Sequence, residues 1–244
     1  MSRYFLEVSY KGTSYAGFQS QQNANAIQDE LEKAMAVFFR SSCHLTGSSR
    51  TDAGVHALQN FFHVDFELPV EPDWQKVTYH LNAILPADIV VKRIYPVEST
   101  SHCRFDARYR TYEYTIYSSK DPFMQDRAFY YPYVLDIDLM NQAAGIVREN
   151  TDFESFSKRN SQVFTYRCII FESEWVRRGN TLVYRVSGNR FLRGMVRGLV
   201  GTMLKVGRKK ITLNDFAGII ATHNPALVDF SVPPQGLMLM EVAY

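Results

Sequence analysis

Cysteine is scarce in this chain, which has three among 244 residues: Cys43, Cys103 and Cys168. They lie far apart, are odd in number and form no Cys-x-x-Cys pair. This distribution argues against both a disulfide framework and a zinc site. Because proteins without disulfides are typical of reducing compartments, a cytoplasmic location is the simplest interpretation.

Long apolar runs are also missing. The N-terminus, residues 1–5, contains no apolar stretch of the kind that forms a signal peptide, and no segment reaches the length needed to cross a bilayer. Neither export nor a membrane partner is therefore expected. No linker rich in proline, glycine or serine interrupts the chain, so its parts are expected to share an interface.

Positive charge is in only slight excess, because the chain has 27 lysines and arginines and 25 acidic residues, which gives a net charge of +2. A protein of this composition that binds a polyanion must concentrate its positive charge locally. The chain is otherwise typical of a packed globular protein, with 46% hydrophobic and 21% charged residues. Its aromatic share of 14% can build a core and can also stack on nucleobases.

Hydrophobic periodicity predicts an alternation of strands and helices in both halves of the chain. The strands are expected at residues 3–10, 55–66, 89–95, 110–117, 167–176, 181–189 and 237–243, and the helices at 26–39, 73–84, 138–149, 191–205 and 212–222. Many of the connections suit antiparallel pairing. The sequence therefore predicts an α+β protein of two similar lobes, residues 1–104 and 105–244, although the halves share no close sequence repeat.

The first segment with chemical potential is LTGSSRTDAGVHA, residues 45–57. Asp52 lies there among small and turn-forming residues, and an ionised carboxylate can act as a nucleophile or a general base. Arg50 and Thr51 could keep it charged and orient it. The alternative is an aspartate that only caps a turn. His56 is a second candidate, but a histidine just before a strand is more often a structural residue.

A second segment carries the local positive charge. From residue 185 to residue 210 no acidic residue occurs, and the basic residues are Arg185, Arg190, Arg193, Arg197, Lys205, Arg208, Lys209 and Lys210. In a helix, Arg190, Arg193 and Arg197 share one face beside an apolar stripe, and the glycines at 194, 198 and 201 form a third line open to close backbone approach. The arginine row is either an RNA-binding surface or a solvated helix face.

A third segment is the tyrosine-rich strand 109–117. Alternation places Tyr112 and Tyr114 on one face and Tyr109 and Tyr117 on the other. The tyrosines could pack within the sheet, or one of them could stack on a base.

Five ordered motifs resemble those of the TruA family of tRNA pseudouridine synthases. They are YKGTSYAGFQSQ with the IQDELEKAM helix (10–35), SSRTDAGVHA (48–57), RFDARYRTYEYTIY (104–117), NRFLRGMVRGLVGTMLKVG (189–207) and PPQGLMLMEVAY (233–244). The departures are mild: Phe18 stands where many members have tryptophan, Ser48 and Ser49 replace a smaller pair, and Arg193 occupies a variable position.

The resemblance implies the pseudouridine synthase fold, with an active cleft between two α/β lobes, and it assigns roles residue by residue. Asp52 is the expected nucleophile. Tyr112 stacks on the base and is also a catalytic candidate as a proton acceptor. Arg197 pairs with Asp52, and Leu237 lines the base pocket. Expected RNA contacts are Arg50, Arg104, Arg190, Arg193, Lys205 and Arg208. The family implies a homodimer that modifies uridines 38–40 in the anticodon stem and loop of tRNA. The isomerisation needs no cofactor or metal, and the sequence shows no phosphate-binding or dinucleotide motif.

Two other classes of protein stay open at this point. A tRNA-binding protein without catalysis would share the basic segment but would not need Asp52. A carboxylate-dependent hydrolase of small molecules would need a second acid beside Asp52 and would not need the arginines.

Overall fold

The computed structural model describes residues 1–67, 70–158 and 163–244. The chain divides into two compact units. The first comprises Met1–Arg108 and Leu239–Tyr244, and the second comprises Tyr109–Met238. The C-terminal residues, which the sequence assigned to the second lobe, thus cluster with the first unit. Both units combine antiparallel strands with helices, as the predicted α+β class requires.

The first unit is built around β1 (Ser2–Tyr10), which lies between β4 (Ile89–Val97) and β3 (His56–Phe66) with both pairings antiparallel. Leu6 of β1 faces Phe62 on one side and Ile94 on the other, and all three side chains are buried. The short strand β2 (Thr46–Gly47) pairs with β3 in antiparallel register. These segments contain many β-branched and aromatic residues, which favour strands because such side chains pack well on a pleated surface.

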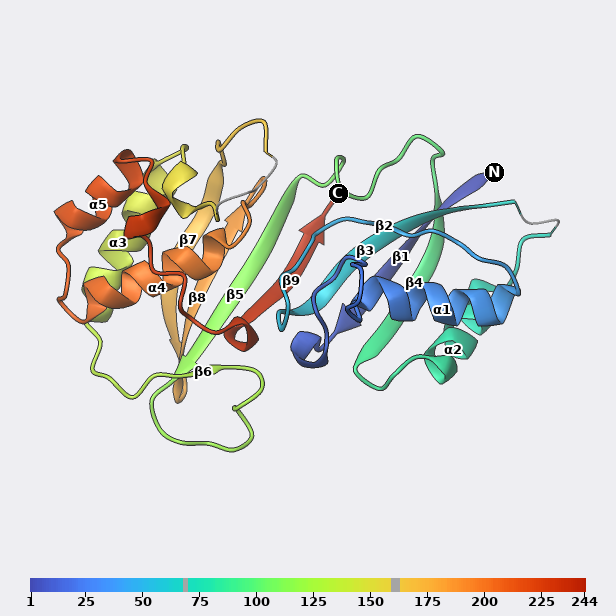
Figure 1. The fold of residues 1–244 in the computed structure, drawn as a ribbon, viewed down its shortest axis with the longest axis horizontal. Coiled ribbons are helices and arrows are strands. Elements are labelled where there is room, and N and C mark those ends of the chain that lie inside the picture. The colour runs from blue at the N-terminus through green and yellow to red at the C-terminus, as the bar shows by residue number, and fades with distance from the viewer. Residues whose placement is uncertain (68–69, 159–162) are drawn as a thin grey trace. The chain divides into compact units, whose positions relative to one another are not determined.

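Helices α1 (Ile27–Phe39) and α2 (Trp74–Ile84) lie side by side in Figure 1, and α2 packs on β4. Both begin at a capped N-terminus. The Asp29 carboxylate accepts the backbone N–H of Ala26 at 2.9 Å, and Asp73 accepts the N–H groups of Gln75 and Lys76. Leu31 and Met35 of α1 and Leu81 of α2 bury the apolar faces that periodicity predicts.

The second unit contains β8 (Thr181–Gly188) between β5 (Tyr109–Tyr117) and β7 (Ile170–Arg178), again with antiparallel pairing. The predicted hairpin turn is confirmed, because β7 ends at Arg178, β8 begins at Thr181, and Gly179 between them has φ 57°. The strand β6 (Phe129–Tyr130) pairs with β5 in parallel.

Helices α3 (Ile137–Glu149), α4 (Met195–Gly207) and α5 (Leu213–Ala221) pack together in this unit, and α3 also packs on β7. The core side chains include Tyr184 of β8 and Leu199 and Met203 of α4. Single-turn helices lie at Glu154–Phe156, Pro225–Leu227 and Pro234–Gly236, and another lies at Gly12–Ser14 in the first unit. The last strand, β9 (Leu237–Ala243), contributes residues to both units.

One predicted helix boundary is wrong. The basic helix was expected from residue 191, but α4 begins at Met195 after Gly194, whose φ of 74° ends any helical path from the preceding residues. The carbonyl of Arg193 instead accepts the backbone N–H of Lys158. Arg190 and Arg193 therefore lie in the turn before α4 and do not share a helical face with Arg197.

The glycines of α4 do permit close approach, as predicted. A Cβ at Gly201 would lie 2.2 Å from the carbonyl oxygen of Asp229, and one at Gly198 would meet the side chains of Val228 and Phe230 at 2.8–2.9 Å. Residues 228–230 therefore cross α4 at a distance that only glycine allows.

We predict that Gly201→Ala destabilises the protein, by about 1–3 kcal/mol, because the backbone at Asp229 must move to admit the methyl group. The matched control is Gly218→Ala in α5, where a Cβ meets nothing within 4 Å. That change should stabilise the helix by about 0.5–1 kcal/mol. Urea unfolding of both variants measures the difference, and equal effects would contradict the close approach.

Candidate functional site

Asp52 lies in the connection between β2 and β3, in the first unit. Its side chain is half-buried, whereas the neighbouring Thr51 is buried and Ala53 is exposed. The backbone turns sharply here: the carbonyl of Asp52 accepts the N–H of Val55 at 3.2 Å, and Gly54 has φ 78°. The loop thus presents one carboxylate, partly open to solvent, on a turn that glycine makes possible.

The motif at residues 10–18 holds this loop in place through its backbone. The N–H of Phe18 donates to the carbonyl of Thr51 at 3.1 Å, and the N–H of Gly54 donates to the carbonyl of Tyr15 at 3.3 Å. At Gly12 a Cβ would lie 2.0 Å from the carbonyl oxygen of Val55. The two motifs, which are separated along the sequence, therefore form one substructure around Asp52.

Buried side chains reinforce the same loop. The hydroxyl of Tyr10 and the Oγ1 of Thr51 are 2.7 Å apart and share a hydrogen bond. The Nδ2 of Asn60 donates to the Tyr10 hydroxyl at 3.1 Å and to the carbonyl of Ser49 at 2.9 Å. Sequence reasoning did not identify Tyr10 or Asn60. The sequence signal that could have drawn attention to this network is an asparagine directly before Phe61 and Phe62 in a predicted strand, because a polar side chain buried there needs hydrogen-bond partners.

His56 makes a contact that agrees with a structural role. It is 2% exposed, and its Nδ1 accepts the backbone N–H of Gly12 at 3.0 Å. An accepting Nδ1 carries no proton, so the ring is neutral in this arrangement. His56 thereby fastens the start of β3 to the motif at residues 10–18.

Two predicted RNA contacts also belong to the first unit. Arg50 is exposed and lies two residues before Asp52. Arg104 is exposed as well, and its guanidinium lies 5.5 Å from the centroid of the Phe105 ring. Phe105 is itself 73% exposed, so the pair presents a flat cationic and aromatic surface.

In the second unit, the predicted base-stacking residue Tyr112 lies on β5 and is half-buried. Its ring meets that of Phe191 edge to face, with centroids 5.2 Å apart. Tyr114 is fully buried on the same strand, and burial raises the pKa of its hydroxyl, which donates to the carbonyl of Pro233 at 2.7 Å. Of the two, Tyr112 is the one with a partly accessible ring.

Arg197 and Leu237 belong to the same region of the second unit. Arg197 of α4 is half-buried, and its Nε and Nη2 both donate to the carbonyl of Val232, at 2.9 and 2.6 Å. Leu237 is buried at the start of β9. Gly236 packs against the ring of Tyr114, where a Cβ would lie 2.6 Å from Cζ. Residues 232–237 thus link α4 to β5 within this unit.

The basic residues of the segment differ in their surroundings. Arg193 is exposed and Arg190 is half-buried, whereas Lys205 pairs with Asp229 at 3.4 Å. Burial alone would raise the pKa of Asp229, but hydrogen bonds from Ser231 and the charge of Lys205 keep it below its usual value. The guanidinium of Arg208 lies 3.9 Å from the centroid of the Tyr133 ring. Asp229, which lies outside residues 185–210, thus balances the charge of Lys205. The segment 185–210 itself contains no acidic residue.

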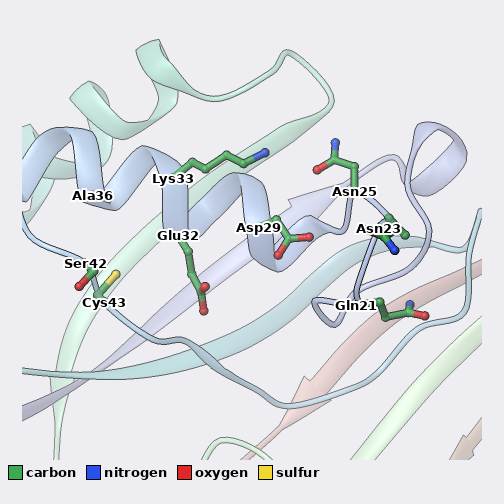
Figure 2. Close-up of a pocket in the computed structure, with 10 residues that line it drawn as sticks. Gln21, Asn23, Asn25, Asp29, Glu32, Lys33, Ala36, Ser42 and Cys43 are labelled. Carbon is green, nitrogen blue, oxygen red and sulfur yellow. The ribbon is translucent and has the colours of Figure 1, made fainter.

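A separate groove runs along α1 (Figure 2). Its lining residues are Gln21, Asn23, Ala24, Asn25, Asp29, Glu32, Lys33, Ala36, Ser42 and Cys43. None of the predicted site residues belongs to it. Its charged lining residues are two carboxylates, Asp29 and Glu32, and one lysine, Lys33, and this excess of negative charge disfavours an RNA phosphate. Within the described ranges, no helix is both long and apolar enough to cross a membrane.

Comparison with known proteins gives consistent matches over the whole chain. A family model described as tRNA pseudouridine synthase matches residues 7–106 and 150–244. The tRNA pseudouridine synthase A of Bacteroides fragilis is 42% identical, covering 100% of this chain and 97% of that protein. That of Parabacteroides distasonis is 39% identical, with coverages of 100% and 96%. That of Staphylococcus aureus is 34% identical, with coverages of 98% and 90%.

We predict that Thr51→Val weakens the Asp52 loop, because valine keeps the shape but leaves the buried Tyr10 hydroxyl without the Thr51 oxygen. The expected loss is about 1 kcal/mol of unfolding free energy. Thr222→Val is the control, since that hydroxyl bonds the carbonyl of Ile219 at an exposed position, and its effect should stay within about 0.5 kcal/mol. Urea titration checks both, and an unaffected Thr51→Val variant would mean that the hydroxyl pair does not hold the loop.

Proposed function

Because the chain belongs to the tRNA pseudouridine synthase family, we propose that this isomerase converts uridine to pseudouridine in tRNA, with Asp52 as the reacting residue. The observation that carries the proposal is the loop at residues 45–57, whose partly accessible carboxylate is held by backbone contacts from a second motif. A turn aspartate with only a capping role would not need such support. The match of the family model to both segments, 7–106 and 150–244, adds to it.

The chemistry requires one bond to break and one to form. The bond from ribose C1′ to N1 of uracil is cleaved, the base rotates, and C1′ bonds to C5. C5 then loses its proton and N1 gains one, so the composition of the RNA is unchanged. Asp52 either bonds to the ribose or removes a ribose proton, and both routes need an ionised oxygen at residue 52.

The second unit supplies the groups proposed to receive the base. A uridine in a stem or loop is stacked and must be flipped out before its glycosidic bond can react. Tyr112 offers a half-buried aromatic ring and Leu237 an apolar side chain. We assign stacking to the first and lining of the base pocket to the second, as the family resemblance implies.

Arg197 has the third role in the proposal, as the partner that keeps the Asp52 carboxylate charged when bound RNA excludes water. Its half-buried guanidinium and double donation to the Val232 carbonyl support a fixed orientation, which a carboxylate partner needs for two parallel hydrogen bonds.

The finer properties are carried over from the resemblance. We propose that the substrates are uridines 38–40 in the anticodon stem and loop, that the protein acts as a homodimer, and that it works in the cytoplasm. Incubation of purified protein with an unmodified tRNA transcript, followed by chemical mapping of pseudouridine, tests the position. A binding protein without catalysis would leave the transcript unmodified, and a small-molecule hydrolase would not bind it.

Asp52→Asn should abolish pseudouridine formation, because the amide replaces the ionised oxygen while keeping its size. Folding and tRNA affinity should remain close to those of the unchanged protein. Pseudouridine mapping and a filter-binding titration measure the two properties. Turnover by a well-folded Asp52→Asn variant would overturn the assignment of Asp52.

Arg197→Lys should slow the chemical step at least tenfold, which corresponds to about 1.4 kcal/mol of barrier, because lysine keeps the charge but lacks the planar fork. Affinity for tRNA should fall much less. Single-turnover kinetics at saturating enzyme measures the step, with Arg193→Lys as the control. If Arg197→Lys weakens binding yet converts bound tRNA at the normal rate, Arg197 is a phosphate contact only.

Arg193→Ala should weaken tRNA binding and reduce the slope of log affinity against log salt by about one. Lys205→Ala should do less, because Asp229 already balances the Lys205 charge at 3.4 Å. Affinity titrations over a range of salt concentrations compare the two. A larger effect at Lys205 would show that its pairing yields to phosphate when RNA binds.

A further inference from the structure

Three side chains of types that ligate metals converge in the first unit. His63 comes from β3, while His102 and Cys103 come from the turn after β4. One ring nitrogen of each histidine and the Sγ of Cys103 all lie within 4.8 Å of one another. The pair His63 Nδ1 and Cys103 Sγ is 3.2 Å apart. We propose that His63, His102 and Cys103 form a zinc site.

The geometry suits Zn²⁺. With Zn–S of about 2.3 Å and Zn–N of about 2.0–2.1 Å, a tetrahedral ion places sulfur and nitrogen about 3.5 Å apart. A shift of a few tenths of an ångström therefore admits the ion between His63 and Cys103. Two imidazoles and one thiolate are ligands that zinc prefers, and a water completes the fourth position. On binding, the Cys103 thiol gives its proton to solvent as the Zn–S bond forms.

The surrounding groups orient these ligands. The Nδ1 of His102 accepts the backbone N–H of Arg104 at 3.1 Å, and the Asp106 carboxylate accepts the backbone N–H of His102 at 2.7 Å. The Asp106 contact fixes the backbone at His102, whereas the Arg104 contact uses the unprotonated ring nitrogen and must open before the neutral ring can hold the ion. The rings of His63 and His102 meet edge to face with centroids 4.6 Å apart.

The charge and access of the cluster also allow an ion. Arg3 lies near enough to interact electrostatically with His63 and Cys103, but Asp65 balances it through two hydrogen bonds of 2.7 Å. Cys103 and His63 are buried, whereas His102 is half-buried and gives a path from solvent. The Cys103 carbonyl accepts the hydroxyl of Tyr244, so an ion here would strengthen the attachment of the C-terminal residues.

A second cluster serves as an internal comparison. Asp152, Glu154 and His223 also have ligand atoms within 4.8 Å of one another. All three are half-buried or exposed, and the Nδ1 of His223 already lies 3.0 Å from Glu154. This cluster lacks a thiolate, so we expect it to bind zinc far more weakly.

The test begins with the full chain stripped by a chelator and titrated with Zn²⁺ against a chromophoric zinc indicator. One equivalent should bind per chain, and Co²⁺ in its place should give a thiolate-to-metal charge-transfer band. His102→Ala should lower the Zn²⁺ affinity by about 10–100-fold, and Cys103→Ser should abolish the Co²⁺ band. Zn²⁺ at about 100 times its Kd should raise the Tm of the unchanged protein by roughly 5–10 °C.

Matched variants make the test decisive. Cys168→Ser alters a buried cysteine whose Sγ contacts the carbonyl of Tyr166 at 3.8 Å, and it should bind Zn²⁺ normally. Glu154→Gln should also bind normally. His102→Ala changes a half-buried turn residue and keeps the test valid if Cys103→Ser fails to fold. The proposal is wrong if the unchanged chain binds no Zn²⁺, if His102→Ala binds it equally well, or if only Glu154→Gln loses it.

Discussion

The Asp52 loop depends on a constraint that applies to every irregular segment, namely that its buried backbone groups must find partners. Here the partners are the N–H of Phe18 and the carbonyl of Tyr15, both on a motif that lies well before the loop in the sequence. The approach is so close that Gly12 cannot carry a side chain. The carboxylate that we propose to react is therefore positioned by contacts of main chain against main chain.

Close packing against glycine also positions segments of the second unit. Glycines in α4 admit the segment 228–230, and Gly236 admits the ring of Tyr114. That segment continues to Val232, whose carbonyl orients Arg197, and to Leu237. Thus Arg197 and Leu237 are both tied to residues 228–237, a stretch whose position depends on close packing at glycine.

Much of the fold could be predicted from the sequence, because the helical period marks the buried faces of α1 and α3. The start of α4 could not, since Phe191 and Leu192 continue an apolar period that only the positive φ of Gly194 interrupts. Family resemblance, not spacing, singled out Asp52 among loop aspartates. The sequence does not predict the pairing of Lys205 with Asp229 or the contact of His63 with Cys103, because each joins residues that are distant in the chain.

The path of the chain has a consequence for its synthesis. The first unit is closed by Leu239–Tyr244, where the N–H of Val242 donates to the side chain of Gln59 and the N–H of Arg108 donates to the carbonyl of Ala243. The ribosome synthesises residues 239–244 only after all of the second unit. The first unit therefore cannot finish folding until the second unit has also left the exit tunnel. The second unit, contiguous in sequence, has no such delay. During translation the second unit should therefore finish folding before the first, which lacks residues 239–244 until synthesis of the second unit is complete.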